Sequence, residues 1–198
     1  MHDPWELENR LYDQGYQAVC GVDEAGAGPL AGPVYAAAVI LPRGLTLPYL
    51  NDSKKVTPRR REILFDQIRE QAIAYAIAWA DEKEIDAINI LNARMLAMDR
   101  AIKMLKPAAD FALIDGNRNK GIELQNEMVV HGDARSASIA AASILAKVSR
   151  DRFMVELAEQ YPQYAFEKHK GYPTKLHYER LRQYGPSPVH RKTFLKKL

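Results

Sequence analysis

Residues 18–41, AVCGVDEAGAGPLAGPVYAAAVIL, decide the fold of this chain. The apolar runs at 18–22 and 34–41 each have the length of a buried strand, and the segment between them is short and rich in glycine and proline. A short connection is enough to pair two strands antiparallel. The sequence therefore predicts a pair of antiparallel strands, with Asp23 and Glu24 where the first strand ends.

The turn that follows these acids has the composition of a binding site. Gly26 and Gly28 bracket a single residue, so the backbone there can adopt a positive φ and approach another molecule closely. Acids that can hold a metal thus lie beside backbone that can touch a ligand. The alternative is an ordinary strand end with a polar turn, since short motifs often match by chance.

Length and composition predict a globular protein of one main domain. The chain has 198 residues, 47% of them hydrophobic and 27% charged. Cys20 is the single cysteine, which excludes an internal disulfide and fits a reducing compartment. The acidic start lacks an apolar signal core, and no apolar run approaches the roughly 20 residues that span a bilayer. We therefore expect a cytoplasmic protein without membrane contact.

Positive charge is concentrated at the end of the chain. Residues 166–198 contain nine Lys or Arg against two acids, a net +7, so the first 165 residues carry −4 of the total of +3. This separation suits a protein that holds cations in one place and phosphates in another. A solvated basic helix at the end of the chain is the alternative.

Hydrophobic periodicity and capping residues predict the other elements. Helices are expected at 5–16, 57–71, 81–105, 136–160 and 174–184, and strands at 72–80, 111–114 and 128–131. Together with the first two strands these define an α/β fold with a mixed sheet. The buried face of the helix at 57–71 is expected to comprise Ile63, Leu64, Phe65 and Ile68. That of the helix at 81–105 is expected to comprise Ile85, Ile88, Leu91, Met95, Met98, Ile102 and Leu105.

Three apolar runs end in an acid: Asp23, Asp115 and Asp133, with Glu24 as a fourth. Sites in open α/β sheets collect at the carboxyl ends of neighbouring strands. If these strands are parallel neighbours, which the sequence alone does not establish, four carboxylates would share a small region and repel unless cations neutralised them. Oxygen ligands favour Mg²⁺ or Mn²⁺. Two such ions promote in-line hydrolysis of phosphodiesters.

Six segments, in order and spanning about residues 20–194, resemble the bacterial ribonuclease HII family. The resemblance implies a ribonuclease-H-like fold with a five-stranded mixed sheet flanked by helices. It places a catalytic domain at 1–165, led by a short helix within 1–17, and a basic helical extension at 166–198. The segments are GVDEAGAGPLAGPVYAAAVILP, NDSKK, DEKEIDAINILNARMLAM, LIDGN, HGDARSASIAAASILAKVSRDR and YPQYAFEKHKGYPT.

The same resemblance implies an activity. Family members cut the RNA strand of RNA/DNA hybrids and cut 5′ to single ribonucleotides in duplex DNA, leaving 3′-hydroxyl and 5′-phosphate ends, as in ribonucleotide excision repair and DNA replication. It makes Asp23, Glu24, Asp115 and Asp133 the catalytic ligands of two Mg²⁺ or Mn²⁺ ions. We expect a monomer. A nucleic-acid-binding protein with disabled catalysis is the alternative, and retention of all four acids favours the enzyme.

Gly26, Ala27 and Gly28 stand where the family has Gly-Arg-Gly, the tripeptide that contacts the ribose 2′-hydroxyl. That hydroxyl distinguishes RNA from DNA. Without the arginine, one phosphate contact worth about 1.5–3 kcal/mol is missing, so junction recognition is expected to be weakened. The sequence leaves open whether Ala27 is natural or introduced. Tyr172 matches the tyrosine that stacks on the deoxyribose at the RNA–DNA junction.

Five further residues are candidate substrate contacts: Asn51, Ser53, Lys54, Ser143 and Lys147. The family pattern favours a phosphate contact for Lys54. Lys147 lies four residues after Ser143, so both face the same way on a helix, where Lys147 could bind a phosphate or pair with an acid. Asn51 and Ser53 are loop-capping residues unless the resemblance holds.

Overall fold

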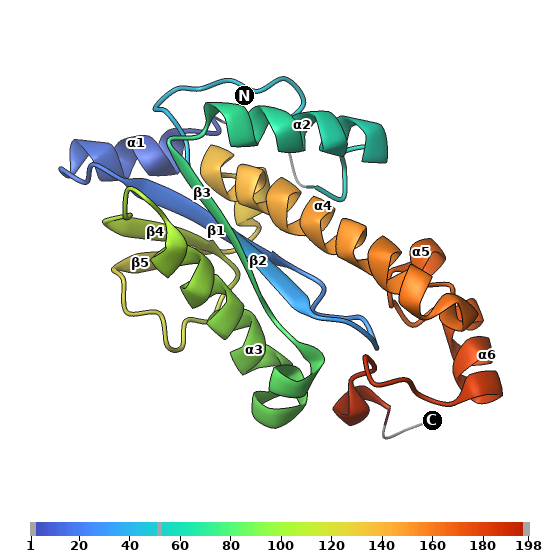
Figure 1. Ribbon diagram of the computed structural model, residues 1–198. Coiled ribbons are helices and arrows are strands. Elements are labelled where there is room, and N and C mark those ends of the chain that lie inside the picture. The colour runs from blue at the N-terminus through green and yellow to red at the C-terminus, as the bar shows by residue number, and fades with distance from the viewer. Residues whose placement is uncertain (1–2, 51–52, 196–198) are drawn as a thin grey trace.

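The computed structural model describes residues 3–50 and 53–195, and Figure 1 shows a twisted sheet between helices. Asn51 lies outside the described residues. The helices are α1 (Glu6–Asp13), α2 (Pro58–Gln71), α3 (Glu82–Met104), α4 (Ala137–Gln160), α5 (Phe166–His169) and α6 (Lys175–Tyr184). The strands are β1 (Val19–Ala25), β2 (Val34–Ile40), β3 (Ala74–Ala80), β4 (Phe111–Asp115) and β5 (Asn126–Val129). Short 3₁₀ turns are η1 (Gly132–Ala134), η2 (Pro162–Tyr164) and η3 (Lys192–Phe194).

The five strands form one mixed sheet in the order β3-β2-β1-β4-β5. β1 pairs antiparallel with β2, as the sequence predicts, and β2 pairs antiparallel with β3. β4 lies parallel to β1, and β5 lies parallel to β4. The assumption that the three acid-bearing segments are parallel neighbours is therefore confirmed for β1 and β4, and for β5 with the turn that follows it. Their carboxyl ends meet at one edge of the sheet.

Helices cover both faces of the sheet, with α3 on one side and α4 with α2 on the other (Figure 1). Side chains along a strand alternate between faces, so Ala36 and Ala38 of β2 pack toward α3, while Ala37 and Val39 pack toward α4. Small residues bring α4 close to β1. A Cβ at Gly21 would lie 2.0 Å from the backbone of Ser138, so only glycine permits this approach.

Three predicted details are wrong. Ile88 and Leu91 of α3 are 37% and 50% exposed, because the helix is interrupted at Asn89 (φ 64°) and the apolar face shifts there. Ile63 of α2 is 51% exposed, because the face centred on Leu64 and Ile68 turns it outward.

Two strand ends also differ from prediction. β5 ends at Val129 rather than 131, since its partner β4 ends at Asp115. β1 continues to Ala25 because its pairing with β2 continues past Asp23.

The segment after α4 folds back onto the loop between β1 and β2. Leu30 and Ala31, between β1 and β2, pack with Tyr164, Phe166 and Leu181 in one hydrophobic cluster. The basic end of the chain is thereby brought next to the Gly26–Gly28 turn. Within residues 3–50 and 53–195, no helix is both long enough and apolar enough to cross a membrane.

Candidate active site

The four predicted acids come from the carboxyl ends of three adjacent strands. Asp23 and Glu24 lie on β1, Asp115 is the last residue of β4, and Asp133 lies in η1, just after β5. Neighbouring side chains on a strand point to opposite faces, so two successive acids can reach one site only near the end of a strand. The pairing of β1 with β4 ends at Val22, and both acids lie beyond that residue.

Asp23 is the most buried of the four acids, 6% exposed. Burial raises the pKa of its carboxyl well above the usual range, and the charges of Glu24, Asp115 and Asp133 raise it further. The backbone N–H of Glu24 donates to Asp23 Oδ1 at 2.7 Å and partly opposes this. The ionised form of Asp23 therefore needs a cation nearby.

Glu24 and Asp115 are each held by one contact. Glu24 Oε1 lies 3.1 Å from Arg94 of α3, and Asp115 Oδ1 accepts a hydrogen bond from Gly132 N–H at 2.7 Å. Burial raises the pKa of Glu24, while Arg94 lowers it. Glu24 Oε2 is buried and has no hydrogen-bond partner among the described residues. A buried oxygen without a partner is costly, and a cation would satisfy it.

As the side chains stand, no three His, Cys, Asp or Glu residues in the described parts of the chain are grouped so that they could hold a metal ion. The donor set nevertheless fits Mg²⁺ or Mn²⁺, because it consists of carboxylate oxygens alone. The unsatisfied Glu24 oxygen and the mutual repulsion around Asp23 are the local reasons for a cation here.

The glycine turn beside the acids is shaped by its surroundings. Gly26 has φ +94°, and a Cβ there would lie 1.9 Å from Arg150 Nε. Gly28 is exposed, and a Cβ there would meet only the Tyr172 ring, at 3.9 Å. Tyr172 is 38% exposed, and Lys147 and Arg150 lie over its ring at 5.9 and 5.7 Å. The structure thus brings Gly28 and Tyr172 together at one exposed surface.

The serines and lysines lie around the same region. Ser143 Oγ donates to Ser53 Oγ at 2.8 Å, and both side chains are buried, so this pair joins α4 to the loop before α2. Lys54 is exposed, and its charge lowers the pKa of Glu24. Lys147 Nζ lies 2.8 Å from Asp151, which is the ion pair expected as its alternative to a phosphate contact.

Three arginines near the site were not expected from the sequence. Arg94 pairs with Glu24, and the buried Arg150 and Arg191 hold the loop between β1 and β2. An arginine among many on a helix or near a chain end carries no sequence signal that marks it as buried. One weak signal existed for Arg150, which follows the small and apolar residues of the first half of α4.

A mixed sheet in the order β3-β2-β1-β4-β5, with acids at the carboxyl ends of its parallel strands, defines the class of ribonuclease-H-like nucleases. The ribonuclease H2 of Pyrococcus horikoshii OT3 superposes with a TM-score of 0.74 at 27% identity, covering 89% of this chain and 93% of that one. The fold of Bst-RNase HIII, solved in complex with Mn²⁺, matches with a TM-score of 0.62 at 18% identity, covering 88% of this chain and 65% of that one.

Sequence comparison narrows the class to one family. The family model described as Ribonuclease HII matches residues 20–197. The Ribonuclease HII of Endomicrobium trichonymphae is 55% identical over 191 residues, which cover 96% of this chain and 91% of that protein. The chain therefore belongs to the ribonuclease HII family, whose members are ribonuclease H endonucleases.

Proposed function

We propose that this chain hydrolyses the RNA strand of RNA/DNA hybrids and cuts 5′ to single ribonucleotides in duplex DNA. The observation that carries the proposal is the convergence of four acids at three adjacent strand ends, where Asp23 is buried against the charges of the other three. In this reaction a water oxygen attacks phosphorus and the bond to the 3′ oxygen breaks. The 3′ oxygen takes up a proton, which leaves 3′-hydroxyl and 5′-phosphate ends.

Asp23, Glu24, Asp115 and Asp133 are the proposed ligands of two Mg²⁺ or Mn²⁺ ions. When bound, such ions activate the attacking water and neutralise the leaving oxygen. The protein's part is to keep four acids at one sheet edge. The Glu24 contact with Arg94 and the Asp115 contact with Gly132 N–H would be shared or given up on metal binding.

Substrate recognition is assigned to the surface next to the acids. The backbone of Gly26, Ala27 and Gly28 is proposed to contact the ribose 2′-hydroxyl, and the exposed ring of Tyr172 to stack on the neighbouring sugar. Lys54 is proposed to contact a phosphate. Lys147 could do the same if it released Asp151. Ser53 and Ser143 face each other rather than solvent, so their role is to fix the loop that carries Lys54.

The alternative of a binding protein with disabled catalysis finds no support, because the chain retains all four acids and belongs to a family of nucleases. The division at residue 165, a monomeric state, and a cytoplasmic role in ribonucleotide excision repair and replication stay predictions from the sequence.

Cleavage of a labelled DNA duplex containing one ribonucleotide, with Mg²⁺ or Mn²⁺, tests this function. We expect one cut 5′ to the ribonucleotide and none in the all-DNA duplex. Asp23→Asn should lower the rate on the order of a thousandfold or more. Asp13→Asn is the matched control, since Asp13 is exposed and pairs with Arg43. Equal cleavage by Asp23→Asn and the unaltered protein would refute the assigned site.

A further inference from the structure

Two buried arginines hold the loop between β1 and β2 by its carbonyl groups. Arg191, near the end of the described chain, is 0% exposed. Its Nη2 donates to Gly26 O at 2.7 Å, its Nη1 to Ala27 O at 3.0 Å, and its Nε to Gly32 O at 2.9 Å. One guanidinium thus binds the loop between β1 and β2 near both of its ends, at Gly26 and Ala27 and at Gly32.

This use of arginine is costly and specific. Among the described residues Arg191 forms no direct ion pair with a carboxylate, although the charges of Glu82 and Asp86 act on it at longer range, and the Phe194 ring lies 5.2 Å from its guanidinium. A buried charge without a directly paired counter-ion is retained only where its hydrogen bonds are needed. Three carbonyls in different directions match the rigid fork of a guanidinium, and a lysine ammonium on a flexible stem does not reproduce that fork.

The contacts of Arg191 leave the donors of the turn available. Because the Gly26 and Ala27 carbonyls are bound to Arg191, this peptide segment is fixed from its inner side. Within the described residues, the N–H groups of Ala27 and Gly28 donate no hydrogen bond. Donors on an open, fixed turn can meet an oxygen of a ligand without first being ordered, which lowers the entropic cost of binding.

Arg150 makes a parallel set of bonds to other segments. It is 1% exposed and donates to Pro33 O at 3.0 Å, to Ala31 O at 3.2 Å and to Lys170 O at 3.0 Å. It therefore supports the later part of the loop and the segment that precedes Tyr172. Of these two arginines, it is Arg191 that binds carbonyls of the Gly26–Gly28 turn itself.

We propose that Arg191 is a positioning residue for ribonucleotide recognition: it fixes the Gly26 and Ala27 carbonyls so that the turn presents its N–H groups to the ribose. That the ligand is a ribonucleotide rests on the proposed function. That Arg191 fixes the turn does not depend on it. It also explains how the turn keeps its shape with alanine at 27, since the supporting arginine comes from the other end of the chain.

Two measurements on the full chain test this. The first is hydrogen–deuterium exchange at the Leu30 and Gly32 amides, the bonded N–H groups of the same loop, which donate to Gly171 O and Val189 O at 2.8 and 2.9 Å. This measurement needs no substrate. The second is the ratio of dissociation constants for an all-DNA duplex and a duplex with one ribonucleotide, measured with Ca²⁺ in place of Mg²⁺ to limit cleavage. The variants are Arg191→Lys, which keeps the charge, and Arg191→Gln, which removes the buried charge and keeps an amide donor. Met98→Ala, on the buried face of α3, controls for general loss of stability.

Both Arg191 variants should speed exchange at the Leu30 and Gly32 amides at least tenfold and reduce the ratio of dissociation constants at least fivefold, while Met98→Ala changes neither. If a folded Arg191 variant keeps wild-type exchange and ratio, the inference is wrong. It is also wrong if Met98→Ala produces the same losses. Should the unaltered protein show no preference for the ribonucleotide, the proposed function fails, and the exchange measurement still decides the role of Arg191.

Discussion

Gly26 and Gly28 differ in the space around them. Gly26→Ala would place a Cβ 1.9 Å from Arg150 Nε at a φ of +94°, so we expect it to lower the free energy of unfolding by about 2–4 kcal/mol. Gly28→Ala meets only Tyr172 at 3.9 Å, so stability should change by less than about 0.5 kcal/mol. Denaturant titration of both variants measures the difference.

The Gly28→Ala variant also tests substrate recognition separately from folding. Gly28→Ala should fold normally and yet cut a single embedded ribonucleotide poorly, because its methyl group lies between the turn and the Tyr172 ring. Normal cleavage by this variant would contradict the placement of the ribose there.

Ala27→Arg introduces the residue that the sequence resemblance leads us to expect at this position. A regained charge-assisted phosphate contact of about 1.5–3 kcal/mol should raise kcat/KM for a single embedded ribonucleotide by about tenfold to a hundredfold. Ala27→Gln, similar in length but uncharged, is the matched control and should gain much less. An unchanged rate with arginine would show that recognition in this chain is not weakened at residue 27.

At this scale the sequence predicts where in the sheet the acids lie, but it gives at most a weak signal for Arg150 and none for Arg94 or Arg191. Asp23 and Asp115 are visible because each terminates an apolar run, a pattern that fixes both element and position. Arg191 lies 165 residues from the carbonyl that it binds, and no local pattern shows that a basic residue near the chain end is buried.

Among the elements, the segment that carries Tyr172 is held to α6 by three buried histidines. His177 Nδ1 donates to Tyr172 O at 3.0 Å, which leaves its Nε2 to accept from His190 Nε2 at 3.0 Å. His190 Nδ1 in turn accepts from Ser187 N–H. The His169 ring stacks on His177 with centroids 4.3 Å apart. This order of donors requires neutral rings.

Acid should therefore destabilise this part of the protein. Burial lowers the pKa of His177 and of His190 to about 4, so as the pH falls below about 6.5 the unfolded chain takes up protons first. The stabilisation is complete above pH 6.5 and is lost between about 6.5 and 4. We expect a fall in the free energy of unfolding of about 2–4 kcal/mol between pH 7 and 4.5.

Urea titrations across this pH range measure the effect. His190→Gln should flatten the dependence, whereas His131→Gln should not, because His131 is exposed. A His190→Gln curve parallel to that of the unaltered protein would exclude the histidine cluster as its source.

Element boundaries show where periodicity stops being informative. The helix starts expected near residues 57, 136 and 174 are confirmed, and the side chains of Thr57, Ser136 and Thr174 each accept a backbone N–H there. For α4 the sequence left Ser136 and Ser138 as alternative caps, and the structure has Ser136. The interruption of α3 at Asn89 is not visible, because asparagine also occurs within helices. Its side chain accepts from Asn92 N–H and starts a new turn, which displaces Ile88 and Leu91 from the core.

For the whole molecule, the separation of charge makes a prediction about salt. The segment 166–198 carries +7 on its own, so binding of a duplex should release counterions. If it contacts three to five phosphates, the slope of log K against log salt should be about −3 to −5. Replacing Lys175, Arg180 and Arg182 of α6 with glutamine should reduce that slope, and replacing the distant Lys103 should not. Binding that hardly varies between low and moderate salt would argue against contact with α6.

The arrangement of the sheet follows from the sequence only in part. The β1–β2 hairpin is local, and its short turn fixes an antiparallel pair. The place of β1 between β2 and β4 depends on contacts between residues more than 80 positions apart, such as Val22 with Ile114, which no single pattern encodes. Only the acids at the strand ends indicate that these strands are neighbours.

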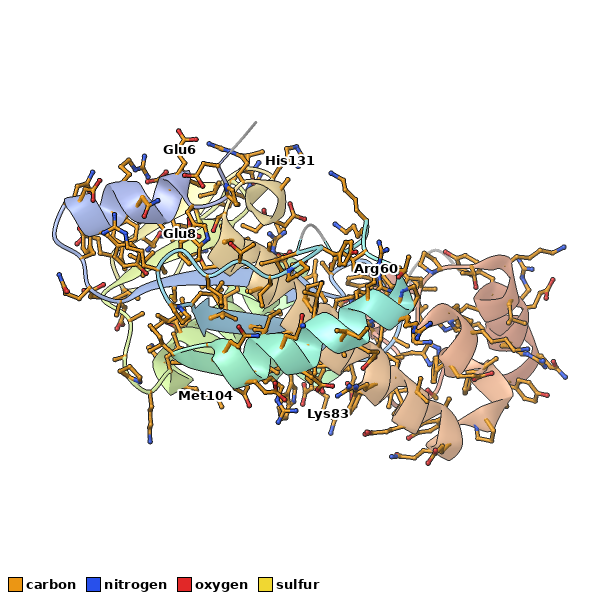
Figure 2. The ribbon with its side chains drawn as sticks, turned by 90° about the horizontal axis from the view of Figure 1, so that it is seen from above. Glu6, Glu8, Arg60, Lys83, Met104 and His131 are labelled. Atoms are coloured by element: carbon orange, nitrogen blue, oxygen red, sulfur yellow. The ribbon has the colours of Figure 1, made fainter. Side chains whose placement is uncertain are left out.

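Helix α1 also makes contacts with residues that are far away in the sequence. Figure 2 shows Glu6 pointing outward from α1 and Glu8 inward. The buried Glu8 Oε1 accepts from Ser136 Oγ at 2.6 Å and from Ser138 N–H at 3.0 Å, so α1 docks on the start of α4. Two segments of the described chain, α1 and the stretch around Arg191, are thus bound to residues more than 100 positions away in the sequence.

The bond from Arg191 to Gly26 has a consequence for protein synthesis. The chain is made from its N-terminus, so the acids, the turn and Tyr172 all leave the ribosome before Arg191 does. A nascent or truncated chain without its last segment would carry every residue proposed to touch the substrate, but not the support of the turn. The turn therefore gains its support only after Arg191 has been synthesised and has folded back onto the carbonyls of Gly26 and Ala27.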